Sequence, residues 1–177
     1  MSEVIKTVLE QYNIDGVWHF TARSNLELIK KHNGLLSLGE LERRRIEIPS
    51  PGGNQWSHDA DKLKGLHDYV HLAFLDDHPM LYLAKQDGRI TDPIWLKIQL
   101  SVLVAEGVRF CSEVSNKSDA VIIGAEEAKK QIDFEVLFTY MDWTDEEVQT
   151  RRQAALKSEI LVPGFVPIER ILSIKNG

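Results

Sequence analysis

The chain has 177 residues, of which 43% are hydrophobic and 27% are charged, as in an ordinary globular protein. This length fits a single domain spanning residues 1–177, and the composition excludes disordered, collagen-like and coiled-coil proteins. With 21 basic and 27 acidic residues the net charge is −6, which excludes a protein that holds nucleic acid only through non-specific phosphate contacts. A local basic patch remains compatible with this balance.

The sequence indicates neither a membrane nor a secreted protein. No apolar run approaches the roughly 18 residues that span a bilayer. Residues 1–15 lack the basic start, apolar stretch and cleavage site of a secretory signal. Cys111 has no second cysteine to pair with, and we favour a small buried residue over a nucleophile. These features predict a cytoplasmic protein without membrane contact.

Helices and strands follow one another irregularly along the chain. Ser24 followed by Glu27 has the spacing of a capping box, and Thr144 followed by Glu147 repeats it. Helices are predicted over residues 1–15, 24–34, 37–45, 78–86, 119–130 and 145–159. Strands are predicted over residues 16–21, 69–74, 94–98, 108–111, 159–162 and 167–174, and a loop over residues 49–57. This pattern favours an α+β fold over a doubly wound parallel sheet.

The common catalytic motifs are absent. The chain has no GxGxxG, no GxxxxGK[ST] and no GxSxG. The segment HDYVH at 67–71 resembles the zinc motif HExxH, but Asp68 is shorter than the required glutamate and the flanking residues favour a strand. Histidines also occur at 58 and 78, yet we favour surface or hydrogen-bonded histidines over a metal site.

Four segments carry side chains suited to chemistry. They are WHFTARSNLELI, the arginine run at 43–45, DYVHLAFLDDHPMLY, and ALKSEILVPGFVPIERILSI. Each has a structural explanation when taken singly. His19 could be a satisfied core histidine, the arginines a solvated helix end, the aromatic residues core, and Glu159 a charge that protects an edge strand.

Taken together and in this order, the four segments resemble the DarT family of nucleic-acid-directed ADP-ribosyltransferases, the toxins of DarT–DarG systems. The resemblance runs from about residue 16 to residue 174, and its most specific parts are the blocks at 69–82 and 158–163. The pattern H-x-T-x-x-x-N-L at 19–26 supports it. It implies an α+β, ADP-ribosyltransferase-like split fold, in which NAD+ binds as co-substrate between two small antiparallel or mixed sheets with flanking helices. No metal is implied.

The resemblance also implies roles for individual residues. Glu159 matches the catalytic glutamate, and His19 matches the histidine that bonds a ribose hydroxyl of NAD+. Cleavage of the nicotinamide–ribose bond builds positive charge on the sugar, which a nearby carboxylate stabilises. Tyr69 and Tyr82 are alternatives for the aromatic that packs on nicotinamide. The full set implied for NAD+ is His19, Thr21, Asn25, Leu26, Tyr69, Phe74 and Tyr82.

In the DarT family the acceptor is a base in single-stranded DNA, commonly thymidine, with guanine as the alternative base, and an arginine is thought to help remove or stabilise its proton. Arg45 is the first match for that arginine and Arg44 the second. The segment 132–158 matches the substrate-recognition loop. Its aromatic residues could stack on unpaired bases and its arginines could meet phosphates, the residues concerned being Tyr140, Trp143, Arg151 and Arg152.

Alternatives for the acceptor and for activity stay open at this point. The acidic balance and the strand VHLAF depart from the family pattern, so RNA and protein are alternative acceptors. A catalytically inactive module that reads nucleic acid or ADP-ribose is the alternative from another class. A macrodomain-type ADP-ribosyl hydrolase is the antitoxin partner that the resemblance implies.

Overall fold

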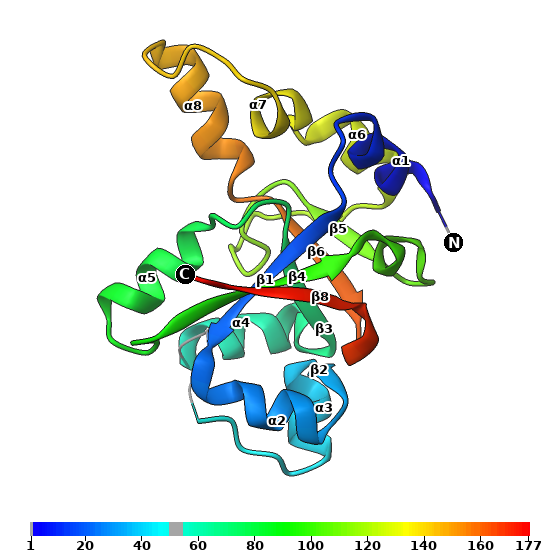
Figure 1. The fold of residues 1–177 in the computed structure, drawn as a ribbon, viewed down its shortest axis with the longest axis vertical. Coiled ribbons are helices and arrows are strands. Elements are labelled where there is room, and N and C mark those ends of the chain that lie inside the picture. Colours follow the sequence, from blue (N-terminus) through cyan, green and yellow to red (C-terminus); the bar gives the residue numbers. More distant parts are fainter. Residues whose placement is uncertain (1, 50–54) are drawn as a thin grey trace.

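The computed structural model describes residues 2–49 and 55–177, with the backbone alone for residues 55–58 (Figure 1). Its larger sheet has six strands in the order β5-β6-β3-β1-β4-β8, and every neighbouring pair is antiparallel. A second sheet pairs β2 with β7. The strands are β1 (Gly16–Ala22), β2 (Gly34–Leu36), β3 (Tyr69–Ala73), β4 (Pro93–Gln99), β5 (Arg109–Cys111), β6 (Glu159–Pro163), β7 (Phe165–Pro167) and β8 (Ile171–Asn176).

The larger sheet is split between β1 and β3. Strand β1 pairs with β4 along its whole length, and β3 pairs with β6 from Tyr69 to Ala73. Between β1 and β3, however, the described register contains the single pair Trp18–Ala73. The two strands diverge beyond this pair, so the sheet consists of two three-stranded halves. This arrangement confirms the expected α+β split fold.

Eight helices of the described chain flank the sheets. They are α1 (Val4–Gln11), α2 (Leu26–Lys31), α3 (Leu38–Arg43), α4 (Gln55–Lys64), α5 (Pro79–Gln86), α6 (Ala125–Gln131), α7 (Phe134–Phe138) and α8 (Glu146–Ala155). Figure 1 shows α1, α6, α7 and α8 at one end of the longest axis, and α2 and α3 at the other. None of the helices in the described ranges is long and apolar enough to cross a bilayer.

The main core lies where α1, α6 and α7 cover the sheet. Ile5 and Leu9 of α1 are fully buried against it, as are Leu96, Phe110 and Ile160 from three strands. Burying such side chains contributes about 1.5–3 kcal/mol each, which makes this core the principal source of stability. Strand β2 and helix α3 lie at the other end of the molecule from this helical layer (Figure 1).

Several element boundaries differ from the sequence prediction. Helix α2 begins at Leu26, after a short 3-10 helix at Arg23–Asn25, and Gly34 opens β2 instead of ending the helix. Helix α6 begins only at Ala125, because Ile123 forms a β-bridge with Phe110.

Two further predictions in the C-terminal half are corrected. The Asp145 carboxylate, rather than the Thr144 hydroxyl, caps α8 by accepting from the Glu147 and Val148 amides at 2.8 and 3.2 Å. The predicted strand over 167–174 is divided into β7, a 3-10 helix and β8. In the predicted loop over 49–57, Gln55 already belongs to α4, and residues 50–54 lie outside the described part of the chain.

Gly34 is required for the pairing of β2 with β7. Its φ is +152°, and a Cβ there would overlap the carbonyl oxygen of Val166 and lie 2.6 Å from the Phe165 ring. Both obstacles belong to β7, so they cannot yield without breaking the two-stranded sheet.

We therefore expect Gly34→Ala to lower the free energy of unfolding more than Gly88→Ala does, as measured by urea denaturation. Gly88 has φ +75° with nothing within 4 Å of an added Cβ, so alanine there carries only the left-handed strain of about 1–2 kcal/mol. An equal loss for the two variants would contradict this account of Gly34.

Candidate active site

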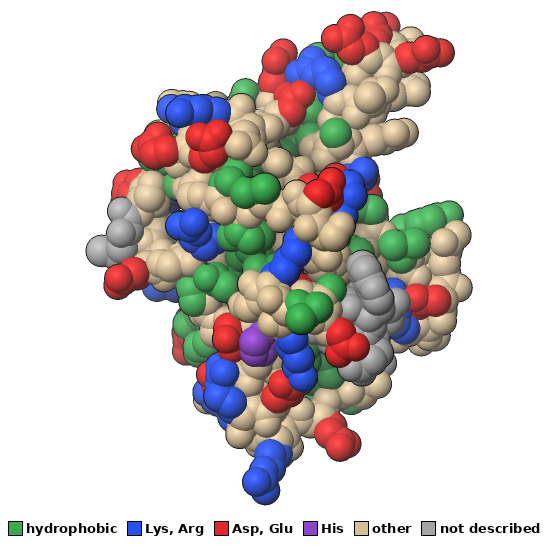
Figure 2. Space-filling model, turned by 180° about the vertical axis from the view of Figure 1, so that it is seen from behind, with side chains coloured by type: hydrophobic (Ala, Val, Ile, Leu, Met, Phe, Trp, Pro, Cys, Tyr) green, Lys and Arg blue, Asp and Glu red, His purple; other side chains and the backbone are tan. Residues whose placement is uncertain are grey.

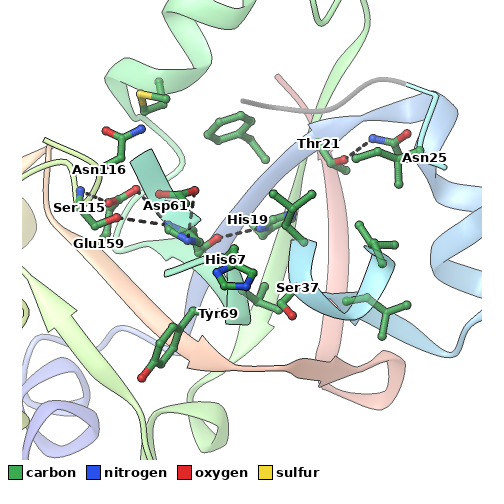
Figure 3. Close-up of a pocket in the computed structure, with 18 residues that line it drawn as sticks. His19, Thr21, Asn25, Ser37, Asp61, His67, Tyr69, Ser115, Asn116 and Glu159 are labelled. Atoms are coloured by element: carbon green, nitrogen blue, oxygen red, sulfur yellow. Dashed lines mark hydrogen bonds and ion pairs between the residues drawn. The ribbon is translucent and has the colours of Figure 1, made fainter. Parts of the chain in front are cut away.

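The split between β1 and β3 opens into a cleft of about 220 Å³ (Figure 3). One wall comes from β1, β3 and β6, and the other from β2 and α3. A smaller cavity of about 90 Å³ adjoins it and shares His19, Thr21 and Asn25 with it. The polar and aromatic lining of the larger cleft includes His19, Phe20, Thr21, Asn25, Ser37, Asp61, His67, Tyr69, His71, Ser115, Asn116 and Glu159.

His19 bridges the split with its side chain. Its Nδ1 lies 2.9 Å from the carbonyl oxygen of His71, on the strand with which β1 no longer pairs. A carbonyl only accepts hydrogen bonds, so Nδ1 carries the proton and Nε2 keeps a lone pair. Burial lowers the pKa of His19 to about 4, so the ring is neutral near pH 7. His19 can therefore accept a hydrogen bond from a hydroxyl in the cleft.

Glu159 is the first residue of β6 and lies at the floor of the cleft with 7% of its surface exposed. Its Oε2 accepts a hydrogen bond of 2.5 Å from the Ser115 amide, and its Oε1 lies 3.7 Å from His71 Nδ1. Burial alone would raise the pKa of this carboxyl. The His71 ring, His78 and the Ser115 amide outweigh burial and lower it, so Glu159 is an anion.

Thr21 and Asn25 form a fixed polar pair beside His19. The Asn25 side-chain amide donates to the Thr21 hydroxyl at 2.9 Å, and both residues are more than nine-tenths buried. They line both cavities, together with Leu36, Leu41 and Ile48. The structure thus brings His19, Thr21, Asn25, Tyr69 and Glu159 of the predicted residues to one cleft (Figure 3).

Three of the residues predicted to bind NAD+ do not line this cleft. Phe74 is 2% exposed and packs between Phe110 and Phe134, because β3 has ended at Ala73 and the chain turns into the core. Tyr82 is 63% exposed on α5, and its hydroxyl accepts from Gln86 at 2.8 Å. Leu26 packs against the main core and borders a separate apolar cavity.

The arginine run at 43–45 separates into paired and unpaired members. The Arg43 guanidinium binds Glu40 and Asp68 at 2.6 and 2.9 Å, and Arg44 binds Glu40 at 3.2 Å. Arg45 makes no ion pair with any residue that the structure describes. Its φ is +57°, at the left-handed position that ends α3, where a non-glycine residue is strained. Arg45 lies between the lining residues Leu41 and Ile48 along the chain.

The aromatic segment before Glu159 forms an exposed cluster. Tyr140 is 91% exposed and meets Trp143 edge to face, with 6.2 Å between ring centroids. The Arg152 guanidinium lies over the Trp143 ring at 4.9 Å. Arg151 is instead held by two hydrogen bonds of 2.7 and 2.9 Å to Asp133. These four predicted residues do not line the cleft, and α8 lies at the end of the molecule away from α3 (Figure 1).

Sequence reasoning missed the roles of His71 and Ser115. His71 was weighed only as part of HDYVH, where the predicted strand is confirmed, and Ser115 carried no signal at all. Their positions beside Glu159 depend on the register of β3 and β5 against β6, which no local pattern encodes. The side chain of His58 lies outside the described residues. Among the described residues no group of three is arranged to hold a metal ion.

Comparison with known proteins agrees with this geometry. A family model described as "ssDNA thymidine ADP-ribosyltransferase, DarT" matches residues 18–175. No curated protein matches the chain. Thermus sp. 2.9 DarT in complex with ADP-ribosylated ssDNA is similar in structure, with a TM-score of 0.66, 19% identity, and coverage of 90% of this chain and 80% of that one.

Two further solved structures share the fold. Thermus sp. 2.9 DarT in complex with NAD+ aligns with a TM-score of 0.58 and 22% identity, over 90% of this chain and 80% of that one. Thermosipho africanus DarTG in complex with ADP-ribose aligns with a TM-score of 0.67 and 18% identity, over 91% of this chain and 43% of that one. Because the family model covers nearly all of the sequence, and the split sheet and its cleft agree with it, the chain belongs to the DarT family of ssDNA thymidine ADP-ribosyltransferases.

Proposed function

We propose that this protein is an NAD+-dependent ADP-ribosyltransferase that modifies a thymidine base in single-stranded DNA, with residues 1–177 acting as one catalytic domain. The ionised Glu159 carboxylate at the floor of the cleft carries the proposal. Breaking the nicotinamide–ribose bond places positive charge on the ribose, and a fixed anion there stabilises the transition state more than the ground state. The geometry of Glu159 suits that task because Ser115 already fixes one of its oxygens.

NAD+ is proposed to extend from the larger cavity into the smaller one. Glu159 Oε1 would accept a hydrogen bond from the ribose 2′-hydroxyl, and His19 Nε2 would accept one from a second ribose hydroxyl. Tyr69 is the aromatic candidate for nicotinamide, since Tyr82 does not line the cleft. The Thr21–Asn25 pair, which lines both cavities, would border the path between them.

The transfer step needs little covalent chemistry from the protein. The bond between ribose C1′ and the nicotinamide nitrogen breaks, its electrons go to the leaving ring, and nicotinamide becomes neutral. A thymine ring nitrogen then bonds to C1′, and the proton of that nitrogen leaves to solvent. Arg45 would favour loss of this proton by stabilising the deprotonated imide, because its guanidinium has no ion pair among the described residues.

The surface of the protein fits a brief encounter with DNA rather than binding over a broad basic surface. On the face seen in Figure 2, basic and acidic side chains are interspersed and no continuous basic surface forms. The cluster of Tyr140, Trp143 and Arg152 offers aromatic faces to unpaired bases. Arg151 is the weaker candidate for phosphate, because Asp133 neutralises it.

Partner and location belong to the same proposal. Similarity to Thermosipho africanus DarTG supports a DarG antitoxin as the partner, which the resemblance to the DarT family implies to be a macrodomain-type ADP-ribosyl hydrolase. Free, buried Cys111 is compatible with the reducing cytoplasm, where NAD+ and DNA are both present.

The acceptor is tested by incubating the protein with NAD+ and single-stranded DNA, duplex DNA, RNA or no acceptor. We expect nicotinamide release and a base-linked ADP-ribose adduct, seen by mass spectrometry, with single-stranded DNA. Duplex DNA should react poorly, because extruding a paired base costs a few kcal/mol. Labelling of RNA or protein without labelling of mixed-sequence single-stranded DNA would contradict the acceptor assignment. NAD+ binding without any release would favour an inactive reader.

The role of Glu159 is tested by Glu159→Gln, which keeps the side-chain volume and removes the charge. We expect the transfer rate to fall by about 100-fold or more, while NAD+ binding by calorimetry is largely retained. Glu169→Gln, at an exposed residue outside the cleft, is the matched control and should leave the rate unchanged. Near-wild-type turnover of Glu159→Gln would refute the assignment.

Arg45 is tested against its neighbour Arg44. Arg45→Ala should lower DNA modification by at least about tenfold and NAD+ hydrolysis far less, because its proposed role concerns the acceptor. Arg44→Ala should have the smaller effect, since Arg44 is already paired with Glu40. A larger loss for Arg44→Ala would move the acceptor role to that residue.

A further inference from the structure

The His71 side chain has four polar neighbours in the cleft. Its Nδ1 lies 3.7 Å from Glu159 Oε1 and 3.4 Å from the Ser115 hydroxyl. Its Nε2 lies 3.2 Å from the Leu66 carbonyl oxygen and 3.9 Å from Asp61 Oδ2. In Figure 3 the Glu159 and Asp61 carboxylates lie close together, and both lie within 4 Å of the His71 ring. His71 therefore contacts two carboxylates inside one cleft.

These contacts determine the proton content of His71. The Leu66 carbonyl accepts only, so Nε2 carries a proton. Burial opposes a second proton on the ring. The Glu159 and Asp61 carboxylates outweigh burial and raise the pKa of His71 to about 9, so the ring is a cation near pH 7. The adjacent His19 differs because burial lowers its pKa and no carboxylate lies beside it in the described contacts.

The distance between His71 and Glu159 has a chemical consequence. At 3.7 Å the two groups attract each other by charge, but they are too far apart for a hydrogen bond. Glu159 Oε2 is occupied by the Ser115 amide, whereas Oε1 keeps its lone pairs for an incoming donor. A direct hydrogen bond from His71 would instead compete with a hydroxyl for that oxygen.

We propose that His71 is a positioning residue for Glu159, whose charged ring keeps the carboxylate ionised and oriented while leaving Oε1 open to the ribose hydroxyl. The proposal rests on the proposed function and extends it to a residue outside the predicted set. It also explains how an acid buried to more than nine-tenths can act as an anion. The group does not touch NAD+ in this scheme, since it acts through Glu159.

Other titratable groups face the pair from each neighbouring element. They are Asp61 on α4, His19 on β1, His78 before α5 and Cys111 on β5. Burial lowers the pKa of His78 and raises that of Cys111, so both are neutral near pH 7. Of these neighbours, Asp61 is therefore the one whose charge changes that of His71 most directly.

The test is the pH dependence of nicotinamide release by the wild type and by His71→Gln, with His67→Gln as control. His67 lines the same cleft but has no described contact with Glu159. In His71→Gln the histidine charge that lowers the pKa of Glu159 is gone, while burial still raises it. The pKa of Glu159 therefore rises, and the acid limb of the pH–rate profile shifts to higher pH by about one to three units. In His67→Gln the acid limb stays at the wild-type pH, whatever the rate. An equal fall of rate at every pH for His71→Gln would overturn the proposal.

Asp61→Asn gives a second readout of opposite sign. The wild-type rate should fall toward that of His71→Gln as the pH rises through about 9, because His71 then loses its proton and with it the charge that orients the Glu159 carboxylate. Removing the Asp61 charge lowers the pKa of His71, so this alkaline limb should move to lower pH while the acid limb moves little. An unchanged alkaline limb would show that His71 does not set it.

A direct titration separates this proposal from the proposed function. The carboxyl carbon of Glu159 is followed by ¹³C NMR in labelled protein, and Glu159→Gln identifies its resonance. A rise of its titration midpoint in His71→Gln supports the proposal even if the wild type releases no nicotinamide. An unchanged midpoint would refute it even if the wild type is an active transferase.

Discussion

The hydrogen bond from His19 to the His71 carbonyl, across the gap between β1 and β3, is the contact on which the site depends. Continued pairing of these strands would leave no cleft, and a wider separation would expose unpaired backbone groups. A neutral imidazole fills the position of a backbone donor and keeps its second nitrogen available. The same side chain therefore closes the sheet on one side and offers an acceptor to the cavity on the other.

Charge is concentrated in this cleft in a way that the net charge of the chain does not indicate. The ring of His71 contacts the Asp61 and Glu159 carboxylates. The backbone amide of Ser115 donates a hydrogen bond to Glu159. The loop that carries Ser115 is in turn held by Lys64, whose ammonium donates to the carbonyls of Ser115 and Ala120 at 3.0 and 3.4 Å. Helix α4 thus contacts the two neighbours of Glu159, since Asp61 lies beside His71 and Lys64 binds the Ser115 carbonyl.

Sequence patterns predicted the helices and strands whose own residues favour that structure. The strand at 16–21 and the Glu159 strand follow from their apolar and β-branched residues, and resemblance to the DarT family gave both a function. Phe74 shows where this reasoning ends, because its partners Phe110 and Phe134 lie more than 30 residues away in sequence. Arg151 shows the same limit, since its partner Asp133 lies 18 residues away in sequence. The position of His71 beside Glu159 depends on the register of β3 and β5 against β6, which no local sequence pattern predicts.

The left-handed backbone conformation of Arg45 lowers the stability of the fold, because a non-glycine residue is strained there. A side chain there costs roughly 1–2 kcal/mol relative to glycine, which adopts this conformation freely. Selection for thermal stability alone would therefore replace Arg45 by glycine at the end of α3. A stabilised variant obtained in this way would keep its fold and its cleft and would lose the guanidinium to which the proposed function gives a role at the acceptor base. The stability of the end of α3 and the proposed acceptor role of Arg45 therefore favour different residues at this position.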